Sequence, residues 1–186
     1  MLFRSAFLFL YTLSVASARG PATVYMIRHG EKPTDKNDQG LAIDGWRRAQ
    51  CLREVFKADS GYNIGRIIAP PVMQNGDHRR PYMTVLPLAQ DLGFEIDDHC
   101  TRKDSECVAD AIRSYDGPGN ILVSWRHSNM GDIQELLGSE NPVDYPKDRF
   151  DIIWTMPYPY NEITDIYSED CPGLDARPGV LAQLYM

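Results

Sequence analysis

Three short clusters of cationic and imidazole side chains lie after predicted buried strands. Two of them stand directly at the end of a strand, and the third ends the loop that follows a strand. They are Arg28-His29-Gly30, Arg79-Arg80 and Arg126-His127. The planar fork of arginine binds phosphate oxygens in pairs, and a neutral imidazole is a competent nucleophile. Because the parallel strands of an α/β sheet end at a common edge, the clusters can converge there. The chemistry they favour together is binding and transfer of a phosphoryl group.

The elements that must position these clusters alternate along the chain. Buried runs rich in β-branched and aromatic residues predict strands, and apolar residues at helical spacing predict helices. Such alternation is typical of one doubly wound α/β domain. We predict strands at 23–27, 64–69, 94–96, 120–125, 150–154 and 162–167, the last two as an antiparallel edge pair, and helices at 41–57, 81–91, 105–115 and 130–137.

Local signals predict several element ends and packing roles. We expect Asp44 to cap the first helix, Ser105 to cap the third, and Gly93 to end the second. Pro81 suits the first turn of the second helix. Trp46 stands at helical spacing with other apolar residues, so core packing is favoured over a role as a substrate platform.

Residues 1–18 have the pattern of a secretory signal peptide. Arg4 precedes an apolar run that is too short to span a membrane, and Ala16-Ser17-Ala18 matches a cleavage site. We expect cleavage after Ala18, secretion to the extracellular space, and one catalytic domain at 19–186. The net charge of −7, with no basic run, argues against partners such as nucleic acid or an anionic membrane.

The four cysteines predict disulfides, since an even count is usual in an oxidising compartment. Cys100 and Cys107 flank a short polar loop and would close it, which leaves Cys51 to pair with Cys171. The alternative is that Cys51 is a buried apolar helix residue. The spacing of cysteine and histidine matches no zinc motif, so we expect neither a metal nor another cofactor.

The chain resembles the histidine phosphatase (phosphoglycerate mutase-like) superfamily, and within it the small secreted fungal members. The resemblance rests on Arg28-His29-Gly30 after the first strand, Arg80 with Thr84 four residues on, and a late strand ending in His127. Pro81-Tyr82 and the run 86–89 also match, so the likeness spans most of residues 19–186. It implies a single-domain, three-layer αβα fold around a mostly parallel sheet.

The resemblance also implies a mechanism. His29 would attack phosphorus and form a phosphohistidine that water hydrolyses, while Arg28, Arg80 and His127 bind the phosphate and stabilise the transferring group. We expect neighbouring cations to lower the pKa of His29 and keep it neutral, with His127 as a charged phosphate ligand. Arg79 lacks a threonine four residues on and is expected to be a solvated loop residue.

The motifs do not identify the residue that would act as general acid. Relatives supply it from a carboxylate, but Ser128 and Asn129 follow His127, where the phytase-like branch has an acidic residue. We choose Glu31 and Asp98 from the alternatives. The other candidates in the interval before His127 are Glu95, Asp97, Asp104 and Glu106. Arg126 either faces away from the site or enlarges its positive field.

Taken together, these features predict a metal-independent phosphatase for a small phosphorylated substrate, most directly a phosphomonoester. A mutase is disfavoured because no long substrate-covering insertion is evident. One alternative is a phosphoramidate or phosphohistidine phosphatase, since such a leaving group needs less help from an acid. The other is a binding or effector protein that keeps the phosphate pocket without turnover. The oligomeric state is not predicted.

Overall fold

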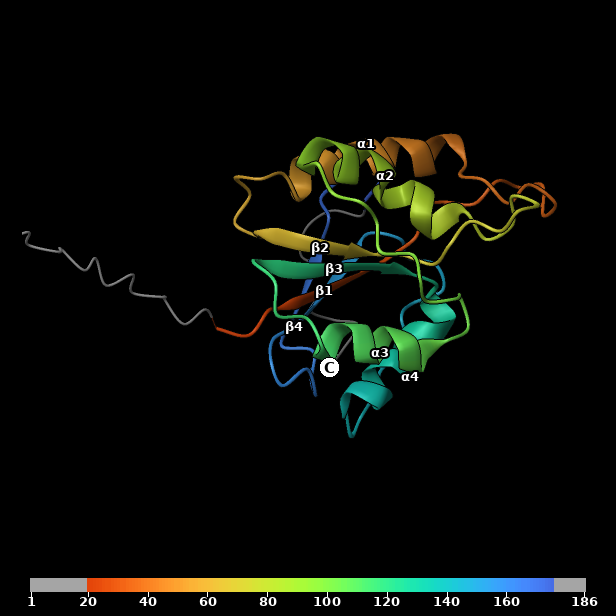
Figure 1. Cartoon of the computed structure of the whole chain (residues 1–186). Helices are drawn as coiled ribbons and strands as arrows, with labels where there is room; N and C mark the ends of the chain where they lie inside the picture. The colour runs from red at the N-terminus through yellow and green to blue at the C-terminus, as the bar shows by residue number, and fades with distance from the viewer. Residues whose placement is uncertain (1–19, 176–186) are drawn as a thin grey trace, which may run out of the picture.

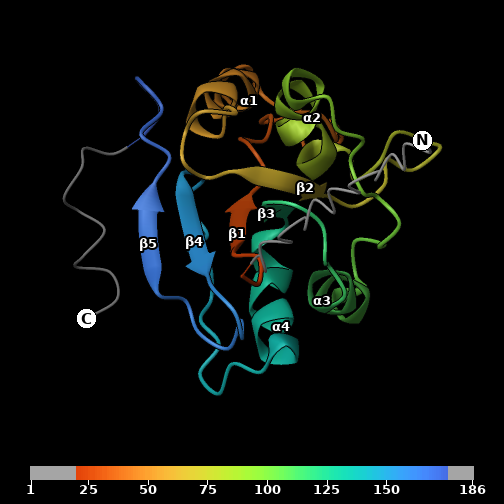
Figure 2. The same cartoon turned by 60° about the vertical axis from the view of Figure 1, so that its left-hand side comes forward.

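A five-stranded sheet lies between two pairs of helices in the computed structural model, which describes residues 20–175 (Figure 1). Helices α1 and α2 cover one face, and α3 and α4 cover the other, as both views show (Figures 1 and 2). This is the three-layer αβα architecture predicted from the sequence. The strands are β1 (Val24–Arg28), β2 (Ile64–Ile68), β3 (Asn120–Trp125), β4 (Ile152–Met156) and β5 (Asp165–Ser168); the helices are α1 (Ile43–Val55), α2 (Arg80–Leu92), α3 (Ser105–Arg113) and α4 (His127–Leu137).

The strand order is β2-β3-β1-β4-β5, and β4 alone runs against the other four strands. Strand β1 pairs in parallel with β3 in a register that places Arg28 opposite Trp125. The two strands therefore end side by side, and the next residues along the chain, His29 and Arg126, emerge at one edge of the sheet. The predicted antiparallel pair is β4 and β5, at the far side of β1.

Each face of the sheet has its own apolar core, because side chains alternate along the strands. On β1, Met26 packs against the α3–α4 layer and Ile27 against the α1–α2 layer. Both side chains are fully buried. Because β1 is the middle strand and is packed on both faces, the position of His29, the residue directly after β1, is fixed relative to the sheet.

Several local predictions need correction. The run 94–96 forms no strand, and only an isolated bridge joins Ile68 to Asp97. Asp104 rather than Ser105 caps α3, by accepting a hydrogen bond from the Cys107 amide at 3.0 Å. Asp44 does not cap α1, whose N-cap is Ala42 without a side-chain bond. Trp46 is 40% exposed, because α1 turns it away from the sheet.

The structure contains both predicted disulfides. Cys51 joins Cys171 across 120 residues, and Cys100 joins Cys107 across the short loop, with Cα separations of 5.7 and 5.6 Å. The first bridge ties α1 to the chain beyond β5. The predicted signal peptide lies outside the described residues, and within residues 20–175 no helix is long and apolar enough to cross a membrane.

Candidate active site

His29 is placed by the end of β1 and is almost completely buried, with 5% of its surface exposed. Its Nδ1 lies 2.8 Å from the carbonyl oxygen of Gly30. A carbonyl only accepts hydrogen bonds, so Nδ1 carries the proton and donates it there. The lone pair is therefore on Nε2, the atom available for attack on phosphorus.

The electrostatic environment keeps this imidazole neutral. Burial lowers the pKa of His29 to about 3, against the opposing effect of the Gly30 hydrogen bond, and the charges of Arg28 and Arg80 lower it further. The direction is the one predicted from the sequence. The main cause is different, because desolvation outweighs the neighbouring cations.

A tight turn fixes the backbone beyond His29. The Gly30 amide donates to Thr84 Oγ1 at 2.9 Å, and that hydroxyl donates to the Arg80 carbonyl at 2.8 Å. A Cβ on Gly30 would lie 3.0 Å from the Cα of Gly45 on α1, which is tighter than most real Cβ contacts, so the neighbouring backbone would have to move by a few tenths of an ångström. The spacing between Arg80 and Thr84 thus has a structural meaning: it locks the first turn of α2 to the loop after β1.

Arg80 begins α2 and reaches back across the loop that precedes α1. Its Nε donates to the Gly40 carbonyl at 3.0 Å and its Nη2 to the Asp38 carbonyl at 2.8 Å. The remaining nitrogen, Nη1, has no partner within residues 20–175, so it can bind a ligand. Arg79 pairs instead with the Asp38 carboxylate at 3.3 Å and faces solvent.

His127 is the first residue of α4, three residues earlier than the sequence pattern placed that helix. Its Nδ1 is buried and has no hydrogen-bond partner within residues 20–175. Burial first, and then the charges of Arg28 and Lys32, lower the pKa of His127 to about 4. We expected a charged ligand here. The protein alone keeps this imidazole neutral, and the charge of a bound phosphate acts in the opposite direction.

Arg28 is buried behind the site rather than in its wall. Its Nη1 donates to the carbonyl oxygens of Pro146 and Lys147 at 3.2 and 2.9 Å, and also to that of Arg149. The guanidinium carbon lies 3.9 Å from the centre of the Phe150 ring. Arg28 therefore contributes positive charge to the site while its hydrogen bonds hold the segment before β4.

The remaining site residues line a small hollow of about 100 Å³, which we call the cationic cavity. Its lining includes four cations and three imidazoles, which come from the segments after β1, β2 and β3 and from the loop before α3. No carboxylate of the described residues lines it. Its lining residues are His29, Lys32, Gln39, His78, Arg80, Pro81, Arg102, Arg126 and His127.

Three cations of this cavity were missed or left open by the sequence. Lys32 lies two residues beyond the first cluster, in a stretch whose pattern predicts only a polar loop. Arg126 was an open alternative, and the structure places it in the cavity wall, where it enlarges the positive field. Arg102 lies between the paired cysteines Cys100 and Cys107, and nothing in its local sequence indicates that this loop folds over the site.

Neither carboxylate chosen as general acid lines the cavity. Glu31 is held on the α1 side by the Arg48 guanidinium, whose Nε and Nη2 donate to both of its oxygens at 2.7–3.1 Å. Asp98 is exposed on the chain before α3. Asp97 is engaged by Arg66. The other carboxylates considered also lie outside the wall, namely Glu95, Asp104 and Glu106.

Comparison with solved structures decides the fold. A protein assigned as phosphohistidine phosphatase SixA from Agrobacterium tumefaciens matches with a TM-score of 0.55 at 16% identity, over 80% of this chain and 98% of that one. The protein histidine phosphatase SixA complexed with tungstate gives 0.54 at 15%, over 79% and 97%. This chain has the same fold as these two proteins. Phosphoserine phosphatase from Entamoeba histolytica, in complex with 3-phosphoglyceric acid, matches at 0.55 and 14%, over 79% and 97%.

Sequence comparison adds no closer relative. No protein-family model matches the chain, and no curated protein matches it. At these identities the likeness establishes the fold and leaves the activity to be argued from the site. The finer resemblance to small secreted fungal proteins receives no support from these neighbours.

Proposed function

We propose that this protein is a phosphatase that takes a phosphoryl group onto Nε2 of His29 and releases it to water. The observation that carries the proposal is the tautomer: the Gly30 carbonyl fixes the proton on Nδ1, inside a cavity that also holds Arg80 and His127. The fold shared with SixA and phosphoserine phosphatase supports the same chemistry.

The reaction follows from the placement of these groups. Nε2 attacks phosphorus in line as the bond to the leaving group breaks, and a P–N bond forms to His29. Arg80 Nη1 and His127 bind the phosphoryl oxygens, while the charge of Arg28 acts from behind. Water then attacks the phosphohistidine, which returns the imidazole and releases inorganic phosphate. The cations supply the charge stabilisation, so we propose that turnover needs no metal.

The lack of a carboxylate among the lining residues narrows the substrate class. An alkoxide leaving group needs a proton from a positioned acid, which contributes roughly 10²–10⁴-fold to the rate. A phosphoramidate nitrogen takes its proton from solvent, and an aryl oxygen departs as a stable anion. The site therefore favours phosphoramidates, among them phosphohistidine, over alkyl phosphomonoesters.

The test compares three leaving groups in one assay. Release of inorganic phosphate is measured from a phosphoramidate, an aryl phosphate and an alkyl phosphate, in chelator, with wild type and His29→Ala. We expect the first two to be hydrolysed, the alkyl ester to react roughly 10²–10⁴-fold more slowly, and the variant to be inactive. Equal rates on aryl and alkyl esters would reveal an acid. Phosphate binding without any turnover would instead establish a binding protein.

We also propose that the protein is secreted. The support is the signal-like pattern of residues 1–18 and the use of all four cysteines in two bridges. Intact-mass measurement of protein from the culture medium should show a chain that begins after Ala18. A retained Met1 would contradict the proposal.

A further inference from the structure

Two arginines at the cationic cavity are exceptions among the arginines of residues 20–175. The other guanidiniums bind a carboxylate or a backbone carbonyl, as Arg28 and Arg80 do. Arg102 and Arg126 have neither kind of acceptor within that part of the chain. In a protein of net charge −7, carboxylates are in ample supply, yet none is placed against this pair. The two positive charges are left available to a ligand.

The positive charges of Arg102 and Arg126 both lower the pKa values of neighbouring cationic groups in the cavity wall. Burial lowers the pKa of Arg126, and the charges of Arg102 and Arg80 lower it further. The pKa of His78 is lowered by burial and by Arg102 and Arg126 in turn, with only Asp77 opposing them. Such mutual repulsion is relieved when an anion binds between the charges. Arg102 and Arg126 line the same small cavity, so an anion bound there can contact both.

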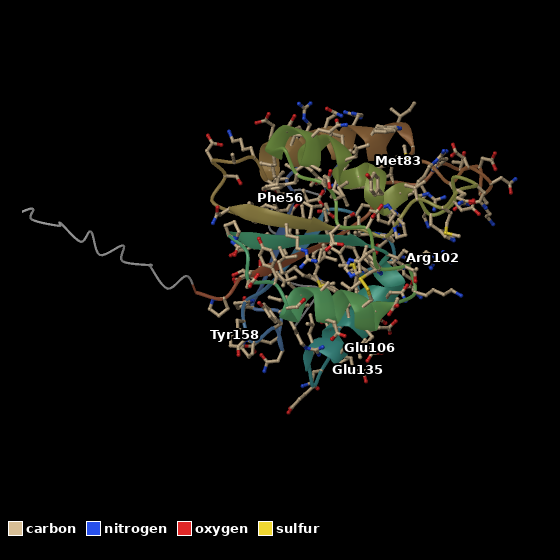
Figure 3. All side chains as sticks on the ribbon, in the orientation of Figure 1. Phe56, Met83, Arg102, Glu106, Glu135 and Tyr158 are labelled. Atoms are coloured by element: carbon tan, nitrogen blue, oxygen red, sulfur yellow. A yellow bond between two sulfur atoms is a disulfide. The ribbon has the colours of Figure 1, made fainter. Side chains whose placement is uncertain are left out.

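The loop that carries Arg102 is fixed at both ends. The Cys100–Cys107 disulfide closes it, and the Asp104 amide donates to the Thr101 carbonyl at 2.9 Å inside the turn. The Asp104 side chain then caps α3. Figure 3 shows Arg102 on the chain that precedes α3, at the side of the molecule where β2 and β3 end. The bridge thus holds a cation over the site from outside the βα junctions.

We propose that Arg102 and Arg126 form a second anion subsite beside His29, and that the preferred substrate is a small molecule with a second phosphate next to the transferred one. The inference rests on the proposed phosphatase function and names its substrate class. Two uncompensated cations match the charge of a phosphate better than that of a carboxylate, and two guanidinium forks offer enough donors for its oxygens.

The size of the cavity limits how far apart the two groups can be. Arg102 and Arg126 line the same small hollow as His29 and Arg80, so an anionic group bound by the two arginines lies close to the transferred phosphate. The second phosphate must therefore be joined to the first directly or through a very short linker. Phosphoanhydrides meet this requirement, and when the bond from the transferred phosphorus to the bridging oxygen breaks, the leaving group is the second phosphate, which needs no carboxylic acid.

Equilibrium binding tests the subsite separately from turnover. Calorimetry at fixed salt compares methylphosphonate, which has one anionic group, with methylenediphosphonate, which has two and is not hydrolysed. We expect the diphosphonate to bind wild type at least 10-fold more tightly. Each arginine forms charge-assisted hydrogen bonds, so Arg102→Gln and Arg126→Gln should each lose roughly 10–100-fold in diphosphonate affinity and leave methylphosphonate nearly unchanged.

The matched control is Lys103→Gln, which removes the same charge from the next residue of the same loop, where the side chain is exposed. It should bind both ligands as wild type does. The Cys100→Ser, Cys107→Ser double variant should lose the diphosphonate preference alone, because Arg102 is then no longer held over the cavity. If Lys103→Gln lost as much diphosphonate affinity as the two arginine variants, the effect would come from the overall charge of the protein, and the proposed subsite would be overturned.

A third ligand and a kinetic measurement separate the remaining outcomes. Phosphonoacetate carries a carboxylate in place of the second phosphonate, and affinity as high as that of the diphosphonate would overturn the assignment to phosphate. Equal affinity for mono- and diphosphonate would overturn the subsite while His29-dependent turnover stands. If methylphosphonate fails to bind and His29→Ala changes no activity, the proposed function itself fails.

Discussion

Replacing Arg48 should strongly destabilise the protein, because this buried arginine of α1 joins three carboxyl groups. Its Nη1 and Nη2 bind Glu169 and Asp175 at 2.5 and 2.8 Å, and it also holds Glu31. The Arg48 side chain is 1% exposed and that of Glu169 is fully buried. Burial raises the pKa of Glu169 to about 8, against the opposing charge of Arg48, so at neutral pH this carboxyl keeps its proton.

The expected magnitude follows from that arrangement. Arg48→Met leaves the carboxylates of Asp175 and Glu31 without a cation and takes a hydrogen-bond donor from Glu169, which together cost roughly 3–5 kcal/mol of unfolding free energy. For a chain of this size the loss corresponds to a drop in Tm of roughly 6–20 °C. The loss should be smaller at pH 5 than at pH 8, because protonated carboxyls no longer need the guanidinium. Urea unfolding followed by circular dichroism at both pH values measures it.

Wild type should also become less stable as pH rises between about 6.5 and 8, where the imidazoles of His29 and His127, with folded pKa values of about 3 and about 4, are neutral in the folded state and lose their last protons in the unfolded state. The folded state keeps the Glu169 proton over this window while the unfolded state releases it, so the free energy of unfolding falls by at most about 1.4 kcal/mol per pH unit. The control is Arg47→Met on the same helix, whose side chain is 57% exposed and whose loss should cost no more than about 0.5 kcal/mol. Equal losses at Arg47 and Arg48, or a loss at Arg48 that is the same at pH 5 and pH 8, would refute the reasoning.

Three further results are expected. In the chain-entropy model, replacing both cysteines of the bridge that spans 120 residues by serine costs about 5 kcal/mol, whereas removing the bridge that spans 7 costs about 2.4 kcal/mol; chemical denaturation should reproduce this order. Thr84→Val leaves the buried Gly30 amide unpaired, so unfolding free energy should fall by roughly 1–3 kcal/mol and phosphate release should slow, and unchanged values would count against the lock. The imidazole signals of His29 and His127 should not titrate between pH 5 and 8 by NMR, since their pKa values lie at about 3 and about 4; a midpoint near 6.5 for either would contradict the burial argument.

The layers of the fold were predictable because they depend on local periodicity. The runs at 23–27 and 120–125 are short, apolar and rich in β-branched residues, and both are central strands. The sequence failed where distant packing decides the outcome. The run 94–96 resembles a strand, but at that position the chain makes only a single bridge to Ile68 and never joins the sheet.

The same division holds at the site. The sequence predicted that His29, Arg80 and His127 lie close together, since parallel strands end at a common edge, and all three line the cavity. Arg28 could not be placed, because its acceptors are carbonyls 118–121 residues away, and backbone carbonyls have no signature in the sequence. Arg102 was hidden for a similar reason: its loop reaches the cavity only through tertiary packing.

The hydrogen bonds of Arg28 have a consequence for the barrier to the proposed phosphoryl transfer. A group that must rotate or shed water as charge develops adds a reorganisation energy to each chemical step. Arg28 is bonded to three carbonyl oxygens and stacked on Phe150, so its charge stays in place before, during and after the transfer. In the proposed reaction the segment 146–149 therefore contributes to catalysis, although it has no side chain in the cavity wall. Substitutions that shift its backbone should slow the proposed reaction, because they displace the positive charge of Arg28.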